Sequence, residues 1–348
     1  MITINDSHLM QLALHYVGNS YQEEGVIYSK SEYILNNDIS TILEKYFTLP
    51  FTKELSYYNL FHESDISLNE IYVYVSNIFS DSNCLHEQSK NLAKHLYIHS
   101  DHPKIRGGEF YVAYFKNFTI ENEPVDAVGI FKSENKDTFL DIKKTETDFI
   151  INGQQGINTN RLDKGCLIFN KDKENGYIVA IIDNTSKGSD AQYWVDDFLH
   201  VRQRKDEYYN TQNALTLCKN FVVKELPQQF EVSKADQADF LNKSVKFFKE
   251  RDAFDMDEFA NEVMGQSEII DSFNVYKEEY QKEREIEIAD NFAISDSAVK
   301  KQSRALKSVI KLDKNFHIYV HGNNQYIKKG YDEETGLYYY QLFFNEEQ

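Results

Sequence analysis

The spacing of apolar residues predicts helices over much of the first hundred residues. Apolar side chains recur with nearly the helical period at 6–17 and 39–47. The segment SNCLHEQSKNLAKHLYIHS at 82–100 also fits a helix with one buried face. The run LNEIYVYVSNIF at 68–79 is compatible with either a helix or a strand. We expect the helical region to end at the glycine pair 107–108.

Beyond residue 108 the pattern changes to short runs that alternate or are apolar throughout. Asn, Asp, Gly and Lys separate these runs, as expected for strands joined by turns. The helical spacing returns in AQYWVDDFL, at 191–199. We expect a mostly antiparallel sheet built from the segments EFYVAYFKNFTI, VDAVGIFK, TFLDIKKT, DFIING, GCLIFN and GYIVAIIDN.

The rest of the chain has helical spacing over residues 206–286 and then strand-like runs. The segments FHIYVHGNNQYIKKG and GLYYYQLFF indicate a small terminal sheet with turns near Gly322 and Gly336. The fold class is α+β, with helices and a mostly antiparallel sheet in the N-terminal part and a helical C-terminal part that ends in a small β-sheet. The expected domains are an α+β N-terminal domain at 1–225 and a helical C-terminal domain with terminal strands at 226–348.

Composition supports a folded protein of about two domains. The chain has 348 residues, of which 41% are hydrophobic and 14% aromatic, and this excludes wholesale disorder. The first residues lack a charged region followed by an apolar core, so no signal peptide is expected. No apolar stretch reaches about 18 residues, so no membrane span is expected either. The three cysteines, Cys84, Cys166 and Cys218, are far apart and odd in number, which disfavours a disulfide framework and favours the cytoplasm.

Charge is distributed unevenly along the chain. The formal net charge is −18, yet acidic and basic residues form two adjacent blocks. Residues 251–296 hold fourteen acidic and four basic residues, a local charge of −10, whereas residues 297–331 hold eight basic residues and one acidic, a local charge of +7. Such blocks indicate either two solvated faces or an acidic segment that shields a basic site. Because the whole chain repels polyanions at a distance, any contact with DNA must be local.

The basic block begins with SAVKKQSRALKSVIKLDK at 297–314, which holds six basic residues and one acidic. If this run is a helix capped near Ser295, its apolar residues Val299, Leu306 and Ile310 pack on the protein. Four cations then fall within about 60° of arc on another side: Lys300, Arg304, Lys307 and Lys311. Such a row could contact successive DNA phosphates. The alternative is a solvent-exposed helical face whose lysines balance the charge of the acidic block. The candidate DNA-binding residues are Lys300, Lys301, Arg304, Lys307, Lys311 and Lys314.

One pattern matches a metal-dependent nuclease. PVD at 124–126 is followed by LDIKK at 140–144, which resembles the P-D…(D/E)-x-K arrangement of such enzymes. Asp126 and Asp141 would hold Mg²⁺ on neighbouring strands, and Lys143 would orient the attacking water. The pattern is short, and ordinary exposed strand residues produce it often.

Histidines form a second candidate, for a metal site. His95 and His99 would share a helical face, with His102 and Asp101 nearby, as zinc ligands do. The sequence between the first two is HLYIH, which lacks the general-base glutamate of HExxH. Surface or packing histidines fit this segment better, so we expect no metal.

Other chemistries are weaker still. His62-Glu63-Ser64-Asp65 contains hydrolase residue types, but adjacent residues rarely converge on one point and no G-x-S-x-G follows. No phosphate-binding glycine motif occurs, NGQQG at 152–156 fits a loop, and Trp194 fits the core. We therefore expect no enzyme activity and no cofactor.

Several segments taken together resemble the bacterial nucleoid-associated protein family of the NdpA type. They occur in the family's order and cover nearly the whole chain: YYNLFHES, SKNLAKHLYIHSDHPKIRGGEFYVAYF, DKGCLIFN, YWVDDFLHV, SVIKLDKNFHIYVHG and KKGYDEETGLYYY. The resemblance implies a cytoplasmic protein on the nucleoid that binds double-stranded DNA and has no catalytic residues. It does not assign any contact residue.

The sequence therefore favours a nucleoid-associated protein that binds double-stranded DNA mainly through phosphates. One alternative is an adaptor for chromosome-associated proteins that uses the acidic helices at 251–296, and another is the metal-dependent nuclease. No membrane partner is expected. The sequence sets neither the DNA sequence preference nor the oligomeric state.

Overall fold

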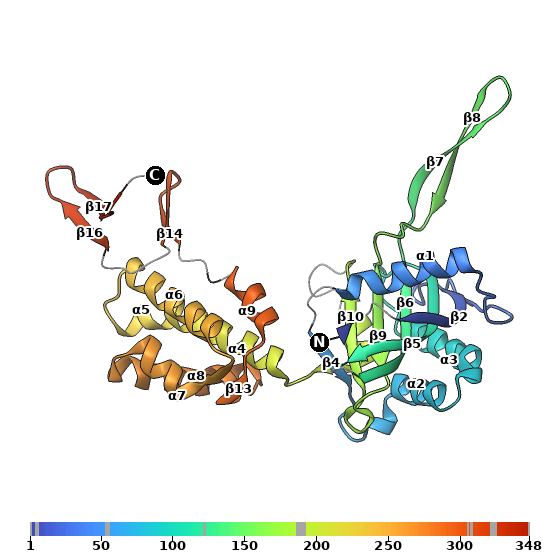
Figure 1. The fold of residues 1–348 in the computed structure, drawn as a ribbon, viewed down its shortest axis with the longest axis horizontal. Coiled ribbons are helices and arrows are strands. Elements are labelled where there is room, and N and C mark those ends of the chain that lie inside the picture. The colour runs from blue at the N-terminus through green and yellow to red at the C-terminus, as the bar shows by residue number, and fades with distance from the viewer. Residues whose placement is uncertain are drawn as a thin grey trace. The chain divides into compact units, whose positions relative to one another are not determined.

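The chain forms two compact units, Met1–Arg204 and Lys205–Gln348 (Figure 1). The computed structural model describes residues 2–3, 7–52, 56–120, 123–185, 193–304, 306, 309–320 and 326–346. The first unit holds a large sheet with helices, and the second holds helices followed by two β-hairpins. The α+β class is therefore confirmed. The division expected at residue 225 differs from this one, because α4 (Glu207–Asn220) already belongs to the second unit.

Nine strands of the first unit form one sheet in the described part of the chain, with the order β11-β4-β10-β9-β6-β5-β2-β3 and with β1 beside β5. Every neighbouring pair is antiparallel, as the sequence indicates. The strands are β1 (Ile2–Thr3), β2 (His8–Val17), β3 (Val26–Ile27), β4 (Tyr57–Leu60), β5 (Gly108–Ile120), β6 (Glu123–Ser133), β9 (Lys164–Phe169), β10 (Ile178–Asp183) and β11 (Val201–Gln203).

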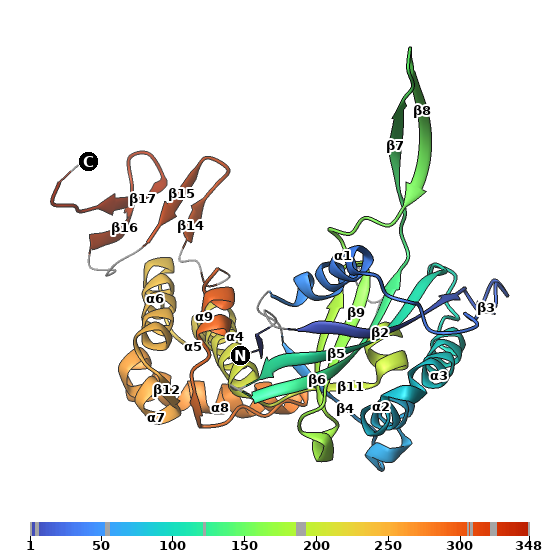
Figure 2. The ribbon, with the colours of Figure 1, turned by 45° about the vertical axis from the view of Figure 1, so that its right-hand side comes forward.

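Helices cover both faces of this sheet. On one face lie α2 (Glu70–Ser80) and α3 (Leu85–Ile98), and on the other lies α1 (Asn37–Thr48) (Figures 1 and 2). The helices expected at 39–47 and 82–100 are confirmed as α1 and α3, and the ambiguous run at 68–79 is the helix α2. Shorter helical segments connect these elements: η1 (Leu49–Thr52), η2 (Ile66–Leu68), η3 (Ser82–Cys84), η4 (Lys173–Asn175) and η6 (Val195–Leu199).

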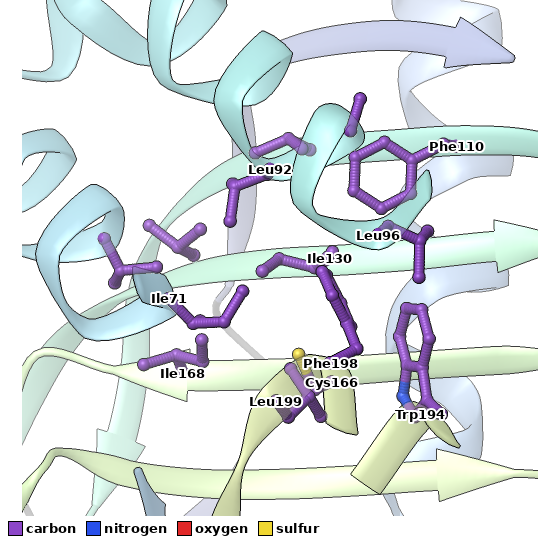
Figure 3. Close-up of a cluster of buried hydrophobic side chains, with 14 of the residues drawn as sticks. Ile71, Leu92, Leu96, Phe110, Ile130, Cys166, Ile168, Trp194, Phe198 and Leu199 are labelled. Carbon is purple, nitrogen blue, oxygen red and sulfur yellow. The ribbon is translucent and has the colours of Figure 1, made fainter. Parts of the chain in front are cut away.

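Each face of the sheet has its own hydrophobic core. Beneath α2 and α3, aliphatic side chains of the helices and strands pack with Phe110, Trp194 and Phe198 (Figure 3). Trp194 is completely buried there, as expected from the sequence. On the opposite face, the ring of Phe47 from α1 stacks on Phe131 of β6, with 4.2 Å between ring centroids. Because both faces are covered, the central strands are apolar at nearly every position.

The helix expected at 6–17 is wrong, because this segment is the strand β2. The strand pairs with β3 on one side and β5 on the other. Leu12 points into the core beneath α1, whereas Ala13 and Val17 point into the core beneath α2 and α3. A strand that is buried on both faces has apolar residues at both even and odd positions. In β2 the spacing of these residues is close to the helical period, which is why the segment resembles a helix in the sequence.

Two strands leave the large sheet and form a separate hairpin. β7 (Asp137–Lys144) pairs with β8 (Phe149–Gly156) in an antiparallel ladder of their own. The pair projects away from the sheet and its helices in both views, and we call residues 137–156 the arm (Figures 1 and 2). The turn is fixed by Thr145, whose backbone N–H donates to the Asp148 carbonyl at 2.8 Å.

Two lysines are buried at one end of the large sheet. Lys132 Nζ donates to the Arg106 carbonyl at 2.7 Å, and Lys164 Nζ donates to both carboxylate oxygens of Asp183 at 2.9 and 2.8 Å. The Tyr193 ring lies 5.8 and 5.0 Å from the two ammonium groups. Because burial of an unpaired charge is costly, the two buried ammonium groups need these partners.

The second unit has a helical core of its own. Its helical elements are α4, η7 (Phe221–Glu225), α5 (Leu226–Gln229), α6 (Lys234–Glu250), α7 (Met256–Phe259), η8 (Ala260–Met264), α8 (Ser267–Arg284) and α9 (Asp296–Ser303). Aromatic rings dominate this core, and Phe248 stacks on Phe254 with 5.0 Å between centroids. None of the helices in the described part of the chain is long and apolar enough to cross a bilayer.

Strands occur at three places in the described part of the second unit. β12 (Ala253–Asp255) pairs with β13 (Asn291–Ala293), β14 (Val309–Leu312) with β15 (Phe316–Tyr319), and β16 (Ile327–Asp332) with β17 (Leu337–Leu342). The terminal strands predicted from the sequence therefore exist, but as two hairpins. The turn expected at Gly336 is confirmed, with φ of 68° at that glycine, whereas the one expected near Gly322 lies outside the described residues.

A buried histidine links β2 to α3. The Nδ1 atom of His15 accepts a hydrogen bond from the Ser29 backbone N–H at 3.0 Å, so the ring proton lies on Nε2. Nε2 is 2.8 Å from Ser89 Oγ, which donates to the His86 carbonyl at 2.8 Å. The pKa of His15 is lowered to about 4, mainly by burial, with smaller contributions from the neighbouring His86 and Lys90. The folded protein therefore holds His15 neutral.

We expect the free energy of unfolding to fall as the pH decreases from about 6.5 to about 4. Over this range the unfolded chain binds a proton at His15 and the folded chain does not, so acid favours unfolding. In His15→Gln the decrease in the free energy of unfolding over this pH range should be smaller by about 1–3 kcal/mol. This difference does not depend on how far the substitution destabilises the protein at neutral pH. Urea denaturation at a series of pH values measures the effect.

The matched control is His8→Gln, which replaces an exposed histidine of the same strand. This variant should retain the pH dependence of the wild type. Parallel curves of stability against pH for the wild type and His15→Gln would contradict the assignment.

Candidate nucleic-acid interface

The basic run at 297–314 is not one helix. The helix α9 begins after Ser295, whose side chain accepts from the Ala298 backbone N–H, and ends at Ser303. Residues 309–312 then form the strand β14. The expected row of four cations on one helical face is therefore wrong: Lys300 lies on α9, Arg304 caps it, and Lys311 lies on β14. Lys307 lies outside the described residues.

The physical reason is the local preference of the second half of the run. Val309 and Ile310 are β-branched and follow one another, which favours a strand. Their strand pairs with β15 across a turn in which Asp313 has a φ of 50°, a conformation that Asp tolerates better than most residues. From Val309 onward the chain therefore forms the hairpin and not a continuation of the helix.

The apolar side of the run is buried as expected. Val299, Leu306 and Ile310 are only 2–3% exposed, although they lie on different elements. The first two pack in the helical core of the second unit, and Ile310 packs beside α6 with Ala235 and Ala238. This packing anchors the run and leaves its charged residues outside.

The described cations of the run all lie at the surface: Lys300, Lys301, Arg304, Lys311 and Lys314. Lys301 Nζ donates to the hydroxyl of Tyr208 at 3.0 Å and lies over its ring. Within the described part of the chain none of the five forms a salt bridge. Their charges therefore remain available to an anion in solution.

The acidic block has other partners. Arg251 pairs with Glu258 and Glu262, and Lys277 pairs with Asp290. Glu287 pairs with Lys205 at 2.7 Å. Each of these cations precedes residue 297, so the ion pairs of the acidic block leave the basic run unneutralised. An exposed carboxylate at a distance still weakens attraction to phosphate through the screened field.

The last hairpin adds cations that lie on aromatic rings. Lys329 Nζ lies 4.6 Å from the ring centroid of Tyr338, and Lys328 Nζ lies 5.5 Å from that of Phe343. Sequence reasoning counted both lysines in the basic block but did not identify their aromatic partners. The three consecutive tyrosines of GLYYYQLFF were the available signal, because pairing of the two runs puts rings opposite Lys329 and Gly330.

The nuclease pattern is not assembled on neighbouring strands. Asp126 lies on β6 of the large sheet, whereas Asp141 and Lys143 lie on β7 of the arm. Asp126 accepts a hydrogen bond from the Tyr114 hydroxyl at 2.6 Å, and Asp141 lies 3.6 Å from the Lys143 ammonium. The expectation that β6 and β7 pair is wrong, because β7 pairs with β8.

The histidines cluster beside a cavity of about 200 Å³ in the first unit. His95 and His99 have ring centroids 4.6 Å apart and line it together with His62 and His200. His95 Nε2 lies 3.1 Å from the Phe198 carbonyl, and burial lowers the pKa of this histidine. Across the described residues, no three His, Cys, Asp or Glu side chains are close enough to hold a metal ion.

The other candidate side chains have structural partners. Asp65 caps η2 by accepting from the Ser67 backbone N–H at 2.8 Å, and the neighbouring Glu63 lies 3.3 Å from His200 Nε2. His102 and Asp101 do not line the cavity. All three cysteines are free thiols, and burial raises the pKa of Cys166 and Cys218.

Comparison with known proteins identifies the family. A search of curated proteins found no match. The family model described as nucleoid-associated protein YejK matches residues 13–338, which is nearly the whole chain. This match confirms the resemblance to nucleoid-associated proteins that the collinear segments indicate. The chain belongs to the YejK family of nucleoid-associated proteins.

Proposed function

We propose that this protein binds double-stranded DNA without enzymatic activity, mainly through phosphate contacts, on the nucleoid in the cytoplasm. The observation that carries the proposal is the set of exposed cations on α9, at its C-cap and on the β14–β15 hairpin, none of which has a carboxylate partner in the described part of the chain. The family to which the chain belongs supports an association with the nucleoid.

The chemistry of these cations favours phosphate over bases. Four of the five described cations are lysines, whose ammonium groups act as point charges with no fixed geometry. Base readout instead favours Arg, Asn or Gln placed at base edges. Contacts of this kind position a protein on DNA but carry no sequence information, so binding should be sequence-tolerant and sensitive to salt.

The proposal is also compatible with the high acidity of the chain. The net charge of −18 repels DNA, but the Debye length at 0.1 M salt is about 10 Å. Repulsion between charges farther apart than this distance is therefore weak. At contact distance the nearest charges decide the interaction, and in the basic run these are positive. Binding should therefore be weaker than that of a basic protein and confined to one surface.

We expect Gln at four of these positions to weaken DNA binding and flatten its salt dependence. If all four bind phosphate, the slope of log K against log salt should decrease by up to about 3.6, since each contact contributes about 0.9. The loss should be the same for two duplexes of unrelated sequence. Fluorescence anisotropy at several salt concentrations measures it. The substitutions are Lys300→Gln, Arg304→Gln, Lys311→Gln and Lys314→Gln.

The control removes the same charge from exposed lysines of the first unit: Lys30→Gln, Lys45→Gln, Lys94→Gln and Lys116→Gln. Its salt slope should equal that of the wild type, and circular dichroism should show both variants folded. An unchanged slope in the folded basic-run variant would remove this surface from the DNA site. That result would favour the adaptor that uses the acidic helices at 251–296.

We further expect no cleavage of supercoiled plasmid by the protein with Mg²⁺ or Mn²⁺. The separation of Asp126 and Asp141 onto two sheets supports this expectation, because a two-carboxylate Mg²⁺ site needs both side chains at one ion. Agarose electrophoresis after incubation is the measurement. Nicking by the wild type that disappears in Asp141→Ala would contradict it.

A further inference from the structure

The hairpin of β16 and β17 has one side packed on the second unit and one side exposed. Alternate residues of a strand point to opposite sides, and the register of the two strands assigns each residue to a side. On the inner side, Ile327 and Tyr340 pack with Ala235 and Ala238 of α6. The outer face is formed by every second residue of each strand: Lys328, Gly330, Asp332, Leu337, Tyr339 and Gln341.

The ring of Tyr339 lies over the backbone of β16 at Gly330, its cross-strand partner. A Cβ atom built at Gly330 would lie 2.2 Å from Cζ, 2.4 Å from Oη and 2.7 Å from Cε1 of Tyr339. A larger residue at this position would therefore displace the ring. One side of the ring is backed by the glycine, and Tyr339 as a whole is 50% exposed. The other side of the ring is available to a flat partner.

A cation and an amide lie one row from this ring on the outer face. Lys328 and Gln341 form the adjacent cross-strand pair of this face, about 7 Å along the strands from Gly330 and Tyr339. Both side chains are exposed. The Lys328 ammonium lies 5.5 Å from the ring centroid of Phe343, the residue that follows β17, and this contact helps to hold the cation at the outer face.

The neighbouring hairpin of β14 and β15 has a similar outer face. Its inner side packs through Ile310 in the same cluster beside α6, and the two hairpins lie next to each other in both views (Figures 1 and 2). Its outer side carries Lys311 opposite His317, and beside them Tyr319, which is 59% exposed. Cations and exposed aromatic rings thus recur on the outer faces of both hairpins.

We propose that the outer face of the β16–β17 hairpin binds single-stranded DNA, with a base stacked on Tyr339 and a phosphate at Lys328. Every base has a flat face that can stack on an aromatic ring, so such a site tolerates any sequence. It requires unpaired nucleotides, because the bases of a duplex are stacked on one another. Both the ligand and the residues therefore differ from those of the proposed function. Membership of a nucleoid-associated family favours DNA over RNA as the single strand.

The carboxylates of the hairpin limit the direction of the bound strand. Asp332, Glu333 and Glu334 lie at its turn, where they repel phosphate. Lys328 is four residues from Asp332, about 13 Å along β16 and thus beyond the Debye length of about 10 Å at 0.1 M salt. The strand should therefore extend from Tyr339 toward Lys328 and away from the turn.

Fluorescence anisotropy with a labelled oligothymidylate of about 15 nucleotides tests the proposal, with a duplex of the same length as the second ligand. At low salt the full chain should bind the single strand with a dissociation constant on the order of 10⁻⁵ M. Tyr339→Leu should raise this constant about fivefold to 150-fold, the range for the loss of one stacked base. It should leave duplex binding unchanged, because no base of a duplex reaches the ring.

Matched variants separate stacking from a loss of structure. Tyr338→Leu removes the adjacent tyrosine, which is 71% exposed and points to the opposite side of the hairpin, and should bind the single strand like the wild type. Tyr339→Phe retains the ring and should also bind normally. Lys328→Gln should flatten the slope of log K against log salt by about 0.7, the value for one phosphate contact on a single strand. Tyr339→Leu should leave this slope unchanged.

No binding of oligothymidylate at about 0.1 mM protein and low salt would overturn the proposal. Equal losses in Tyr338→Leu and Tyr339→Leu would also overturn it, and so would an equal loss of duplex and single-strand binding in Tyr339→Leu. Duplex binding without single-strand binding would contradict this inference alone. Single-strand binding that depends on Tyr339, without duplex binding, would support it and contradict only the proposed function.

Discussion

Burial of the large sheet on both faces is the constraint on which the first unit depends. Its central strands lie between α1 on one side and α2 and α3 on the other, so they present apolar side chains in both directions. Charged residues can enter such a sheet only with partners, as Lys164 does with Asp183. The two cores fill both faces, and the basic run of the sequence lies in the other unit.

The second unit combines a helical aromatic core with a charged surface. The acidic block pairs with cations of its own neighbourhood, and the basic run is anchored by Val299, Leu306 and Ile310. Lysines on α9 and on β14 are thus held at the surface without carboxylate partners among the described residues. This separation leaves local positive charge at the surface of a strongly acidic chain, which the proposed phosphate contacts require.

Local pattern predicted most of the elements, and its failures have a common cause. The strands after residue 108 and the helices at 39–47 and 82–100 are correct because pairing and packing agree with local preference. At 6–17 and 297–314 the apolar spacing fits a helix, but strand pairing, favoured at 309–310 by two β-branched residues, decides otherwise. β2 is buried between β3 and β5, and Val309 and Ile310 enter a hairpin.

The candidate sites show the same limit. The sequence located the basic residues and their apolar anchors, since both depend on composition and short-range spacing. It could not show that Arg251 and Lys277 pair with carboxylates of the acidic block, because ion-pair choice depends on packing. Nor could it show that β7 pairs with β8 rather than β6, since strand patterns do not specify partners.

The most direct test of the central claim is chemical footprinting of lysines with and without duplex DNA. Acetylation followed by mass spectrometry reports the accessibility of each lysine in the intact protein. We expect DNA to protect Lys300, Lys301, Lys311 and Lys314 and to leave Lys143 and Lys144 of the arm unchanged. Protection confined to residues 1–204, or none at the basic run under conditions in which DNA is bound, would contradict the account.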